Sequence, residues 1–260
     1  MQDWLFDDPV QVISLRRSRE RRERFAQRHA GFNWAFEFVD GVDGAEQWPG
    51  LSGSRRVQQA WQDGWSQGAI GAGLSHCLMW RRCLQLKRPI CVLEDDVIVA
   101  SEWREQVANL LDQSPSDPDF LLLGWNLDSV LKAELFPGVC CISLFEPPFP
   151  GVDLIRRLLR ESSARRFCRL QKALGLPGYV ITPSGAQKLL DGLPQLIAEP
   201  LIVGRGIPEV PSMTLDAQMN RIYPTMSSYV AMPPLVLAEN DKVTSMTSPR
   251  HTPQDFGSTV

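Results

Sequence analysis

The sequence predicts an α/β fold in which a mostly parallel central sheet is flanked by helices. Two observations support this prediction. The N-terminal part alternates short apolar runs with helical segments, and this β-α-β order is typical of a parallel sheet. Further along, the apolar run at 90–93 leads straight into three acids at 94–96 and then into more apolar residues, which indicates a buried strand that ends in acids.

The first strand is expected over residues 10–15, an apolar run. Ser18 is placed to cap a helix over 19–30, and Gly31 is expected to end that helix. A second strand is expected over 35–39. The other expected elements are helices over 69–80, 102–111, 153–174 and 183–190, strands over 90–93, 120–125, 139–145 and 178–182, and loops over 40–44, 47–67 (with some helix) and 199–211.

The chain has 260 residues, enough for one large α/β domain or two small ones. We expect a single domain over residues 10–240, with an extension over 1–9 and a polar tail over 241–260. The net charge of −3 argues against a nucleic-acid-binding protein, because such proteins usually carry a strong basic excess.

The six cysteines form no C-x-x-C pair and most lie in apolar segments, so we expect buried free thiols in a reducing compartment. The N-terminus is unlike a signal peptide, and no apolar run reaches the ~18 residues of a membrane span. The expected location is therefore the cytoplasm. Two arginine-rich stretches, 16–28 and 156–172, predict contact with phosphates, peripheral contact with the inner membrane, or simply solvated faces.

The three consecutive acids carry most of the chemistry. Alternate side chains of an extended backbone share a face, so Glu94 and Asp96 are expected to point one way and Asp95 the other. Mg²⁺ typically takes one or two carboxylates and completes its shell with phosphate oxygens of the substrate. Ligands of open α/β sheets collect at the carboxyl ends of strands. The pattern predicts a site for a metal ion and a diphosphate, and the alternative is a solvated acidic turn.

The end of the first strand is where a nucleotide is expected to bind in such a fold. Candidates for contact with the base and ribose follow the strand directly, and an arginine of the next helix is placed to reach a phosphate. Two aspartates after the second strand are candidates to bind ribose or sugar hydroxyls, although Asp-Gly turns need no ligand. These candidates are Ser14, Leu15, Arg16, Arg22, Asp40 and Asp43.

Five segments, taken in order, resemble glycosyltransferase family 25, the bacterial sugar transferases of lipopolysaccharide and lipooligosaccharide synthesis. A single segment is a weak match, whereas five in order with sensible gaps are fairly specific. The resemblance covers roughly residues 10–240 and includes Asp216 and the later run 233–236. The segments are VISLRRS with two arginines after it (12–22), VDGVDG (39–44), GAIGAGLSH (68–76), VLEDDV (92–97) and GYVITPSGAQKLL (178–190).

This resemblance implies a GT-A-like nucleotide-sugar-binding fold and transfer of a hexose, most often galactose from UDP-galactose, with inversion. The implied acceptor is a saccharide such as lipopolysaccharide or lipooligosaccharide, and the implied cofactor is Mn²⁺ or Mg²⁺ held by the acidic motif. The family usually carries an acid where this chain has Ala69 and a cysteine where it has Ala72. Altered specificity or reduced activity is the expected consequence of these two departures.

Asp96 is the first choice for a direct metal ligand. Glu94 and Asp95 are expected to contact ribose, a metal-bound water or the metal itself. His251, in the polar tail, is a further candidate metal ligand. His76 is a candidate for binding the metal or a phosphate, and the alternative is a core or capping histidine.

Inversion requires a carboxylate to take the proton of the acceptor hydroxyl. Asp216 is the best-placed acid for this role, with a helix cap as the alternative, and Asp153 and Asp191 are weaker rivals. Ser75 and Tyr179, which lie in the matched segments, are candidates for binding the nucleotide sugar.

Two other functions are compatible with these residues. One is another metal-dependent phosphate-handling enzyme, although the chain lacks the G-x-x-x-x-G-K-[ST] phosphate loop. The other is a nucleotide-sugar-binding protein with little turnover, which the Ala69 departure favours.

Overall fold

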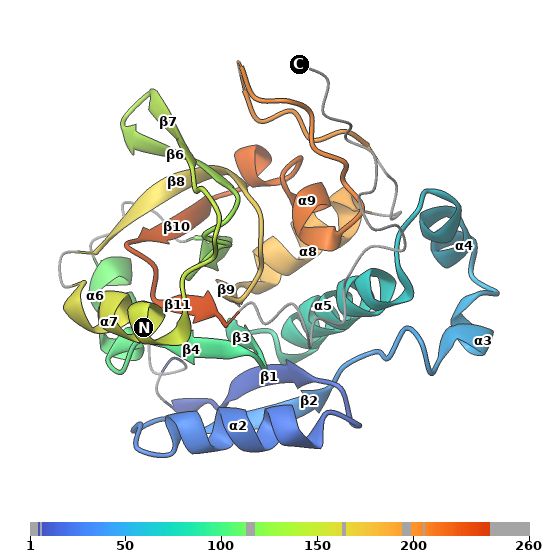
Figure 1. Cartoon of the computed structure of the whole chain (residues 1–260), viewed down its shortest axis with the longest axis horizontal. Helices are drawn as coiled ribbons and strands as arrows, with labels where there is room; N and C mark the ends of the chain where they lie inside the picture. The colour runs from blue at the N-terminus through green and yellow to red at the C-terminus, as the bar shows by residue number, and fades with distance from the viewer. Residues whose placement is uncertain are drawn as a thin grey trace.

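The computed structural model describes residues 5, 7–112, 118–162, 165–193, 199–204 and 206–239. In this part of the chain helices cover both faces of a nine-stranded mixed sheet, so the α/β class is confirmed (Figure 1). In spatial order the strands are β2 (Phe36–Asp40), β1 (Val10–Ser14), β3 (Ile90–Glu94), β9 (Gly178–Ile181), β5 (Phe120–Leu122), β10 (Ser228–Met232), β8 (Arg166–Ala173), β6 (Val130–Phe136) and β7 (Val139–Leu144). Two further strands, β4 (Val97–Val99) and β11 (Val236–Ala238), pair with each other.

The predicted helices over 19–30, 69–80, 102–111 and 183–190 are confirmed. The loop-rich region 47–67 contains two short helices, in line with the expectation of some helix. The helices are α2 (Arg19–His29), α3 (Trp48–Leu51), α4 (Arg55–Gln62), α5 (Gln67–Leu86), α6 (Trp103–Asp112), α7 (Val152–Glu161), α8 (Pro183–Gly192) and α9 (Leu215–Met219), with a 3₁₀ turn at Tyr223–Thr225.

The prediction of a mostly parallel sheet is wrong. β1 runs parallel to β2 and β3, and β5 to β10. The antiparallel pairings are β3–β9, β5–β9, β8–β10, β6–β8 and β6–β7. A parallel neighbour needs a long crossover, whereas β6 and β7 follow each other through a tight turn at Pro137 and Gly138, which has φ +77°.

The helix expected over 153–174 is also a wrong prediction. Only α7 is helical, and the segment continues as the strand β8. Buried Cys168 and Leu170 alternate with arginine and glutamine along β8, and this is the period of a strand with one face in the core. The second arginine-rich stretch is therefore divided between a helix and a strand.

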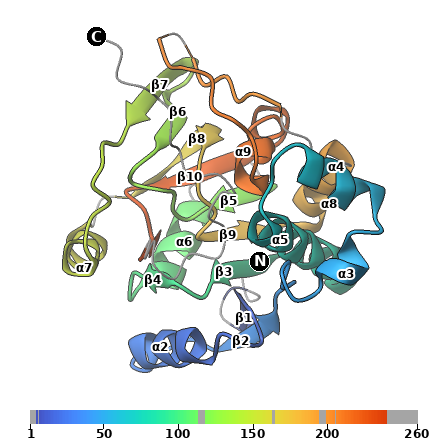
Figure 2. The ribbon, with the colours of Figure 1, turned by 45° about the vertical axis from the view of Figure 1, so that its right-hand side comes forward.

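Two hydrophobic layers enclose the sheet. One lies between the sheet and the helices α5, α8 and α9, and contains Trp80, Phe120 and Tyr179. The other lies between the sheet and the helices α2, α6 and α7, and contains Phe25 and Trp103. Figure 2 shows α5 and α8 on one side of the sheet and α7 on the other.

The parallel unit β2-β1-β3 positions the candidate site. Helix α2 connects β1 to β2 on one face of the sheet, and α5 leads into β3 on the other face. The connections therefore leave the two sides of β1 towards opposite faces, which makes the carboxyl end of β1 a topological switch point. Ligands of open α/β sheets bind in the crevice outside such a point.

Glycines allow the chain after β2 to lie directly on the start of α5. A Cβ at Gly44 would overlap the backbone carbonyl of Gln67, and a Cβ at Gly71 would lie 2.7 Å from the backbone nitrogen of Gly44. The small residues of this helix thus permit a backbone-to-backbone contact that any side chain would break.

Cys77, Cys83, Cys91 and Cys168 are buried free thiols, as predicted. Cys140 and Cys141 are also free but exposed, because β7 is the last strand at its edge of the sheet among the described residues.

None of the described helices combines the length and the apolar character needed to cross a membrane.

His29 occupies the last turn of α2 and is 3% exposed, among the rings of Phe25, Phe32 and Trp34. Burial lowers its pKa from 6.5 to about 4, because the imidazolium would lose its hydration, and the charge of Arg28 acts in the same direction. The folded protein therefore binds this proton less well than the unfolded chain does. Stability that is present above pH 6.5 is lost as the pH falls towards 4.

The free energy of unfolding of the wild type should decrease as the pH falls from 6.5 to 4. We expect His29→Leu to make that decrease smaller, by up to about 3 kcal/mol. Urea unfolding at pH 7 and pH 4.5 measures the effect, and Gln27→Leu on the exposed side of the same helix is the control. His76, also buried, keeps part of the pH dependence in the variant. An unchanged slope in His29→Leu would contradict this account of the fold.

Candidate active site

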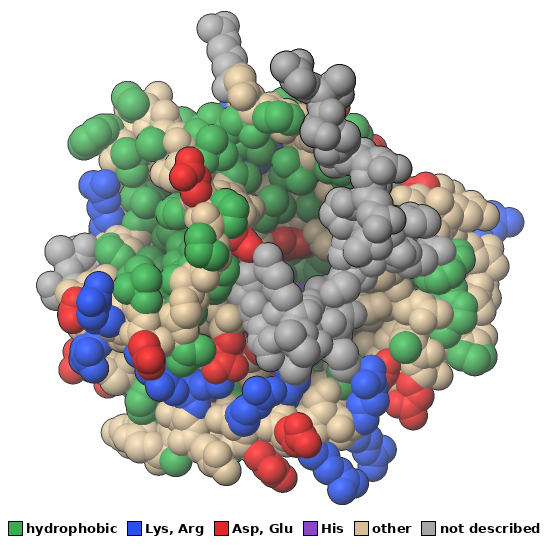
Figure 3. Space-filling view, viewed as in Figure 1, with side chains coloured by type: hydrophobic (Ala, Val, Ile, Leu, Met, Phe, Trp, Pro, Cys, Tyr) green, Lys and Arg blue, Asp and Glu red, His purple; other side chains and the backbone are tan. Residues whose placement is uncertain are grey.

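A cavity of about 420 Å³ opens at the carboxyl ends of β1, β2 and β3. Its walls come from the loop after β1, the start of α2, the loop after β2, the first turns of α5 and the acids that follow β3. Figure 3, viewed as in Figure 1, shows a hollow near the centre of this face with acidic atoms inside it. The cavity lies where the strand order places a ligand crevice.

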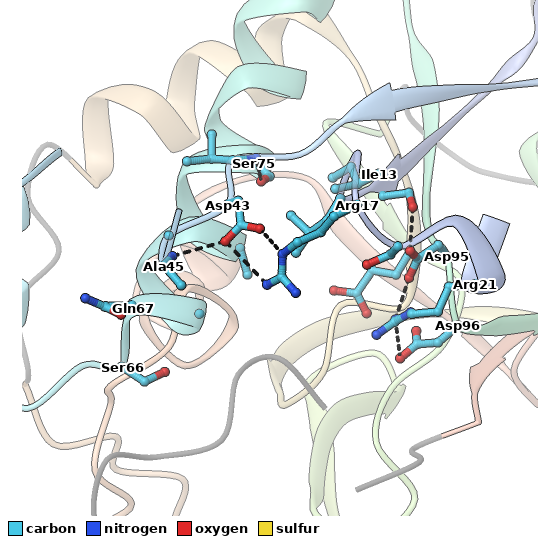
Figure 4. A pocket seen from close by; sticks show the side chains of 18 of the residues that line it. Ile13, Arg17, Arg21, Asp43, Ala45, Ser66, Gln67, Ser75, Asp95 and Asp96 are labelled. Atoms are coloured by element: carbon cyan, nitrogen blue, oxygen red, sulfur yellow. Dashed lines mark hydrogen bonds and ion pairs between the residues drawn. The ribbon is translucent and has the colours of Figure 1, made fainter. Parts of the chain in front are cut away.

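The acidic motif forms the floor of this cavity and is tied to β1 and α2. The Ser14 hydroxyl donates a hydrogen bond to Asp95 Oδ2 at 2.6 Å. Arg21 forms an ion pair with Asp95, and its Nη2 lies 3.0 Å from Asp96 Oδ2 (Figure 4). The Arg21 guanidinium thus contacts two neighbouring acids. The acids of the motif still line a cavity that is large enough for a ligand.

Ionisation of the motif is costly. Burial raises the pKa of Glu94 to about 8, with the charges of Asp95 and Asp216 adding to the effect and Arg21 opposing it. Burial together with the charge of Glu94 raises the pKa of Asp96 to about 7. About a third of each side chain is exposed, and that surface lines cavities. Positive charge brought into the cavity would relieve this cost.

The opposite wall is built around Asp43 and Arg17, which form an ion pair (Figure 4). Asp43 Oδ1 also accepts hydrogen bonds from the backbone nitrogens of Ala45 and Glu46, both at 3.1 Å. The Arg17 guanidinium holds the pKa of Asp43 below its ordinary value. Ser75 Oγ accepts a hydrogen bond from the Val42 nitrogen at 2.8 Å and so fixes the loop on α5.

A second cavity of about 220 Å³ shares Ala72, Glu94 and Asp96 with the first. Its other walls include His76 on α5 and Asp216 on α9. The acidic motif therefore lies between two spaces, and Asp216 reaches it from a distant part of the chain.

Asp216 is held by the backbone. The nitrogen of Gly175 donates a hydrogen bond to its Oδ2 at 2.6 Å, and Gly175 has φ +91°, which favours glycine. Thr214, not Asp216, occupies the N-cap of α9, so the helix-cap alternative does not describe this carboxylate. The structure leaves Asp216 as an acid on the wall of the second cavity.

His76 is 4% exposed and lies between Tyr179 and Glu94. Its Nδ1 is 3.1 Å from the Tyr179 hydroxyl and its Nε2 is 3.5 Å from Glu94 Oε1. Burial lowers the pKa of His76 to about 4, and the negative charge of Asp216 only partly offsets this. The imidazole is therefore neutral at physiological pH.

The structure brings most of the candidate residues together. The larger cavity is lined by Ser14, Leu15, Asp43, Ser75 and the acidic motif, and the smaller by His76, Asp216, Glu94 and Asp96.

Other candidates lie outside both cavities. Arg16 is exposed, Tyr179 is fully buried, and Arg22 and Asp40 form an ion pair with each other. His251 lies outside the described residues.

Two arginines that the sequence had not singled out line the larger cavity. Arg17 lies in the turn that precedes α2 and Arg21 lies in the first turn of that helix, whereas Arg22 contacts Ser14 and Asp40. Ser18 precedes α2 without a capping hydrogen bond and lines the same cavity. Both residues belong to the arginine-rich stretch 16–28, for which phosphate contact was one of the expected roles.

An aromatic side chain completes the larger cavity. Trp61 on α4 lines it, and the ring of Trp48 packs on Trp61 at 4.6 Å. Trp65 is instead fully buried in the core.

Removing one charge from the motif should change how stability depends on pH. Folded-state pKa values above those of the unfolded chain mean that the native protein retains protons, so stability falls as the pH rises from about 4 towards 8. We expect Asp96→Asn to raise the Tm relative to wild type more at pH 8 than at pH 5, by an amount on the order of 2 °C after solvent screening.

Differential scanning fluorimetry without added metal measures this shift. Asp153→Asn is the matched control, because Asp153 is fully exposed on α7. An equal Tm difference between Asp96→Asn and the wild type at the two pH values would mean that ionisation of the motif does not destabilise the fold.

Comparison with known proteins agrees with this geometry. A family model described as glycosyltransferase family 25 (LPS biosynthesis protein) matches residues 7–202, which is well over half of the chain. The match includes β1, α5 and the acidic motif, and it ends before Asp216. No curated protein matches the chain. On the strength of the family match, the chain belongs to glycosyltransferase family 25.

Proposed function

We propose that this chain transfers a hexose from a UDP-sugar to a saccharide acceptor, with the donor in the larger cavity and the acceptor in the smaller. The observation that supports this assignment is that the two cavities meet at Ala72, Glu94 and Asp96. Transfer requires the anomeric carbon and an acceptor hydroxyl to approach at one point while each molecule has its own space. The volume of about 420 Å³ is in the range of small-molecule sites.

The larger cavity offers positive charge to a diphosphate. Arg17 and Arg21 line it, and α5 begins at its wall with Gln67 and Gly68. The N-terminus of a helix carries partial positive charge and backbone N–H groups, both of which favour phosphate. Trp61 provides an aromatic face for the base or the sugar.

The acidic motif fits a hard divalent cation. Asp96 Oδ1 is buried and makes no hydrogen bond in the described structure, and Glu94 borders both cavities. Within the described residues no group of three or more His, Cys, Asp or Glu is arranged to hold an ion. We therefore assign Glu94 and Asp96 as ligands alongside diphosphate oxygens, the usual arrangement for Mg²⁺. Mn²⁺ or Mg²⁺ held by these residues would supply positive charge that stabilises the departing diphosphate.

In this mechanism Asp216 takes the proton from the acceptor hydroxyl. The Gly175 nitrogen holds one carboxylate oxygen, and Oδ1 makes no hydrogen bond to any described residue. A base on the acceptor side is what inversion requires, because the acceptor attacks from the face opposite the leaving diphosphate. Arg21 forms ion pairs with Asp95 and Asp96, and its positive charge lies near the proposed position of the leaving group.

Ala69 and Ala72 enlarge the reaction space. Ala69 lines the smaller cavity and Ala72 lines both. The family resemblance implies an acid and a cysteine at these positions, whereas this chain has two methyl groups, so we propose a changed acceptor specificity with Asp216 retained as the base.

We extend the proposal to a single GT-A-like domain over residues 10–240, with galactose as the hexose and lipopolysaccharide or lipooligosaccharide as the acceptor. The family description supports this acceptor class. We also propose that the protein works in the cytoplasm with peripheral contact to the inner membrane. Arg156, Arg157 and Arg160, all exposed on α7, support that contact.

Donor binding should depend on the metal. We expect one UDP-hexose to bind in the presence of Mn²⁺ and the affinity to fall at least about tenfold in EDTA or in Asp96→Ala. Isothermal titration calorimetry against a panel of nucleotide sugars measures this, with Asp153→Asn as the control. Tight binding of the UDP-hexose in the presence of EDTA would contradict a role for the metal ion. A preference for nucleotides without a sugar would favour another phosphate-handling enzyme.

Loss of the proposed base should affect chemistry more than binding. We expect Asp216→Asn to lower kcat by about 10² or more while the Kd for the UDP-sugar stays within about threefold, since the base acts on the acceptor. Asp191→Asn is the matched control, because Asp191 is exposed on α8 and lines neither cavity. Transfer at the wild-type rate by Asp216→Asn would assign the base elsewhere, and binding without turnover in the wild type would favour a binding protein.

A further inference from the structure

His76 is the residue that connects the smaller cavity to the hydrophobic core. It projects from α5, lines the cavity, and is almost completely buried. Tyr179, on β9, is fully buried behind it, with its ring stacked on Phe120 at 5.1 Å. Tyr179 lines neither cavity, and within the described part of the chain its hydroxyl contacts His76, which does line one.

An ionised Glu94 sets the direction of the contact, because a carboxylate only accepts hydrogen bonds and the ring nitrogen that faces it must then carry the proton. A neutral imidazole has one donor and one acceptor nitrogen. When the Tyr179 hydroxyl donates to Nδ1, the proton of the ring lies on Nε2, which faces Glu94 Oε1. Among the described residues, no other side chain donates to the Glu94 carboxylate. The separation of 3.5 Å is long for a hydrogen bond, and long hydrogen bonds in empty active sites often tighten only when a ligand binds.

We propose that Tyr179 and His76 are positioning residues that hold the Glu94 carboxylate at the junction of the two cavities. The proposal rests on the proposed function, because Glu94 is there a ligand of the donor's metal ion. The chain Tyr179–His76–Glu94 is comparable to the outer partners that orient metal ligands in other proteins, whose loss typically weakens metal affinity or activity 10–100-fold.

The alternative is that both residues only pack the core. The chain contains a matched tyrosine that separates the two roles. Tyr223 is also fully buried and also packs on Phe120, at 5.5 Å, but its hydroxyl contacts the Met219 sulfur at 3.9 Å and does not contact His76. Removing the hydroxyl from either tyrosine disturbs the same core, whereas only Tyr179→Phe releases the imidazole.

The experiment compares Tyr179→Phe with Tyr223→Phe in the full chain. Calorimetry with UDP and Mn²⁺ gives the affinity of the metal complex, and steady-state kinetics gives kcat and KM for the UDP-sugar. We expect Tyr179→Phe to weaken Mn²⁺–UDP binding about tenfold and to lower kcat, and Tyr223→Phe to match the wild type in both. Thermal unfolding of the two variants reports any shared loss of core stability.

A second pair tests His76 directly. His76→Gln keeps an N–H donor in reach of Glu94, and His76→Leu removes it. We expect His76→Gln to retain more of the Mn²⁺–UDP affinity than His76→Leu at similar thermal stability.

Equal losses in Tyr179→Phe and Tyr223→Phe, no loss in Tyr179→Phe, or equal losses in the two His76 variants would each overturn the positioning role. A wild-type chain that binds neither UDP nor Mn²⁺–UDP would instead overturn the proposed function itself.

Discussion

Repulsion among neighbouring carboxylates is the constraint around which this site is built. Glu94, Asp95 and Asp96 follow one another at the end of a buried strand, and Asp216 adds a further charge from α9. Arg21 and Ser14 hold Asp95, which leaves Glu94 and Asp96 facing the cavities with pKa values above the ordinary range. A polypeptide that keeps such a cluster at the floor of a cleft is prepared to receive positive charge there.

The parallel part of the fold was predictable because its signals are local. Each of β1, β2 and β3 is a compact apolar run, and α2 and α5 between them have clear boundaries. In the antiparallel part, β5, β7 and β9 were predicted as strands, but apart from the β6–β7 hairpin their pairing joins segments that are distant in the chain. Strands β6, β10 and β11 have no strong pattern of their own, and β8 alternates within an arginine-rich stretch that also suits a helix. Tertiary pairing decided the conformation of these segments.

The candidate site was predictable to the same extent. The acidic motif and Asp43 stand out because carboxylates after a strand have a recognisable chemistry, and the structure places them on one cavity. The choice among seven arginines between 16 and 28 needed the path of the turn after β1 and the phase of α2 relative to the sheet, and only the fold supplies these. The sequence indicated His76 and Tyr179 as candidate binding residues, but the contact between them depends on the packing of α5 against β9.

Ala72 has a consequence for how this protein can change. Its methyl group belongs to the walls of both spaces, so a larger residue at this one position narrows both of them together. With the donor and the acceptor in these two cavities, as we propose, the preferences for the two substrates are not independent. On that proposal, a replacement of Ala72 that is selected for a new glycan also alters the tolerance for the activated sugar, so the two substrate ranges change together.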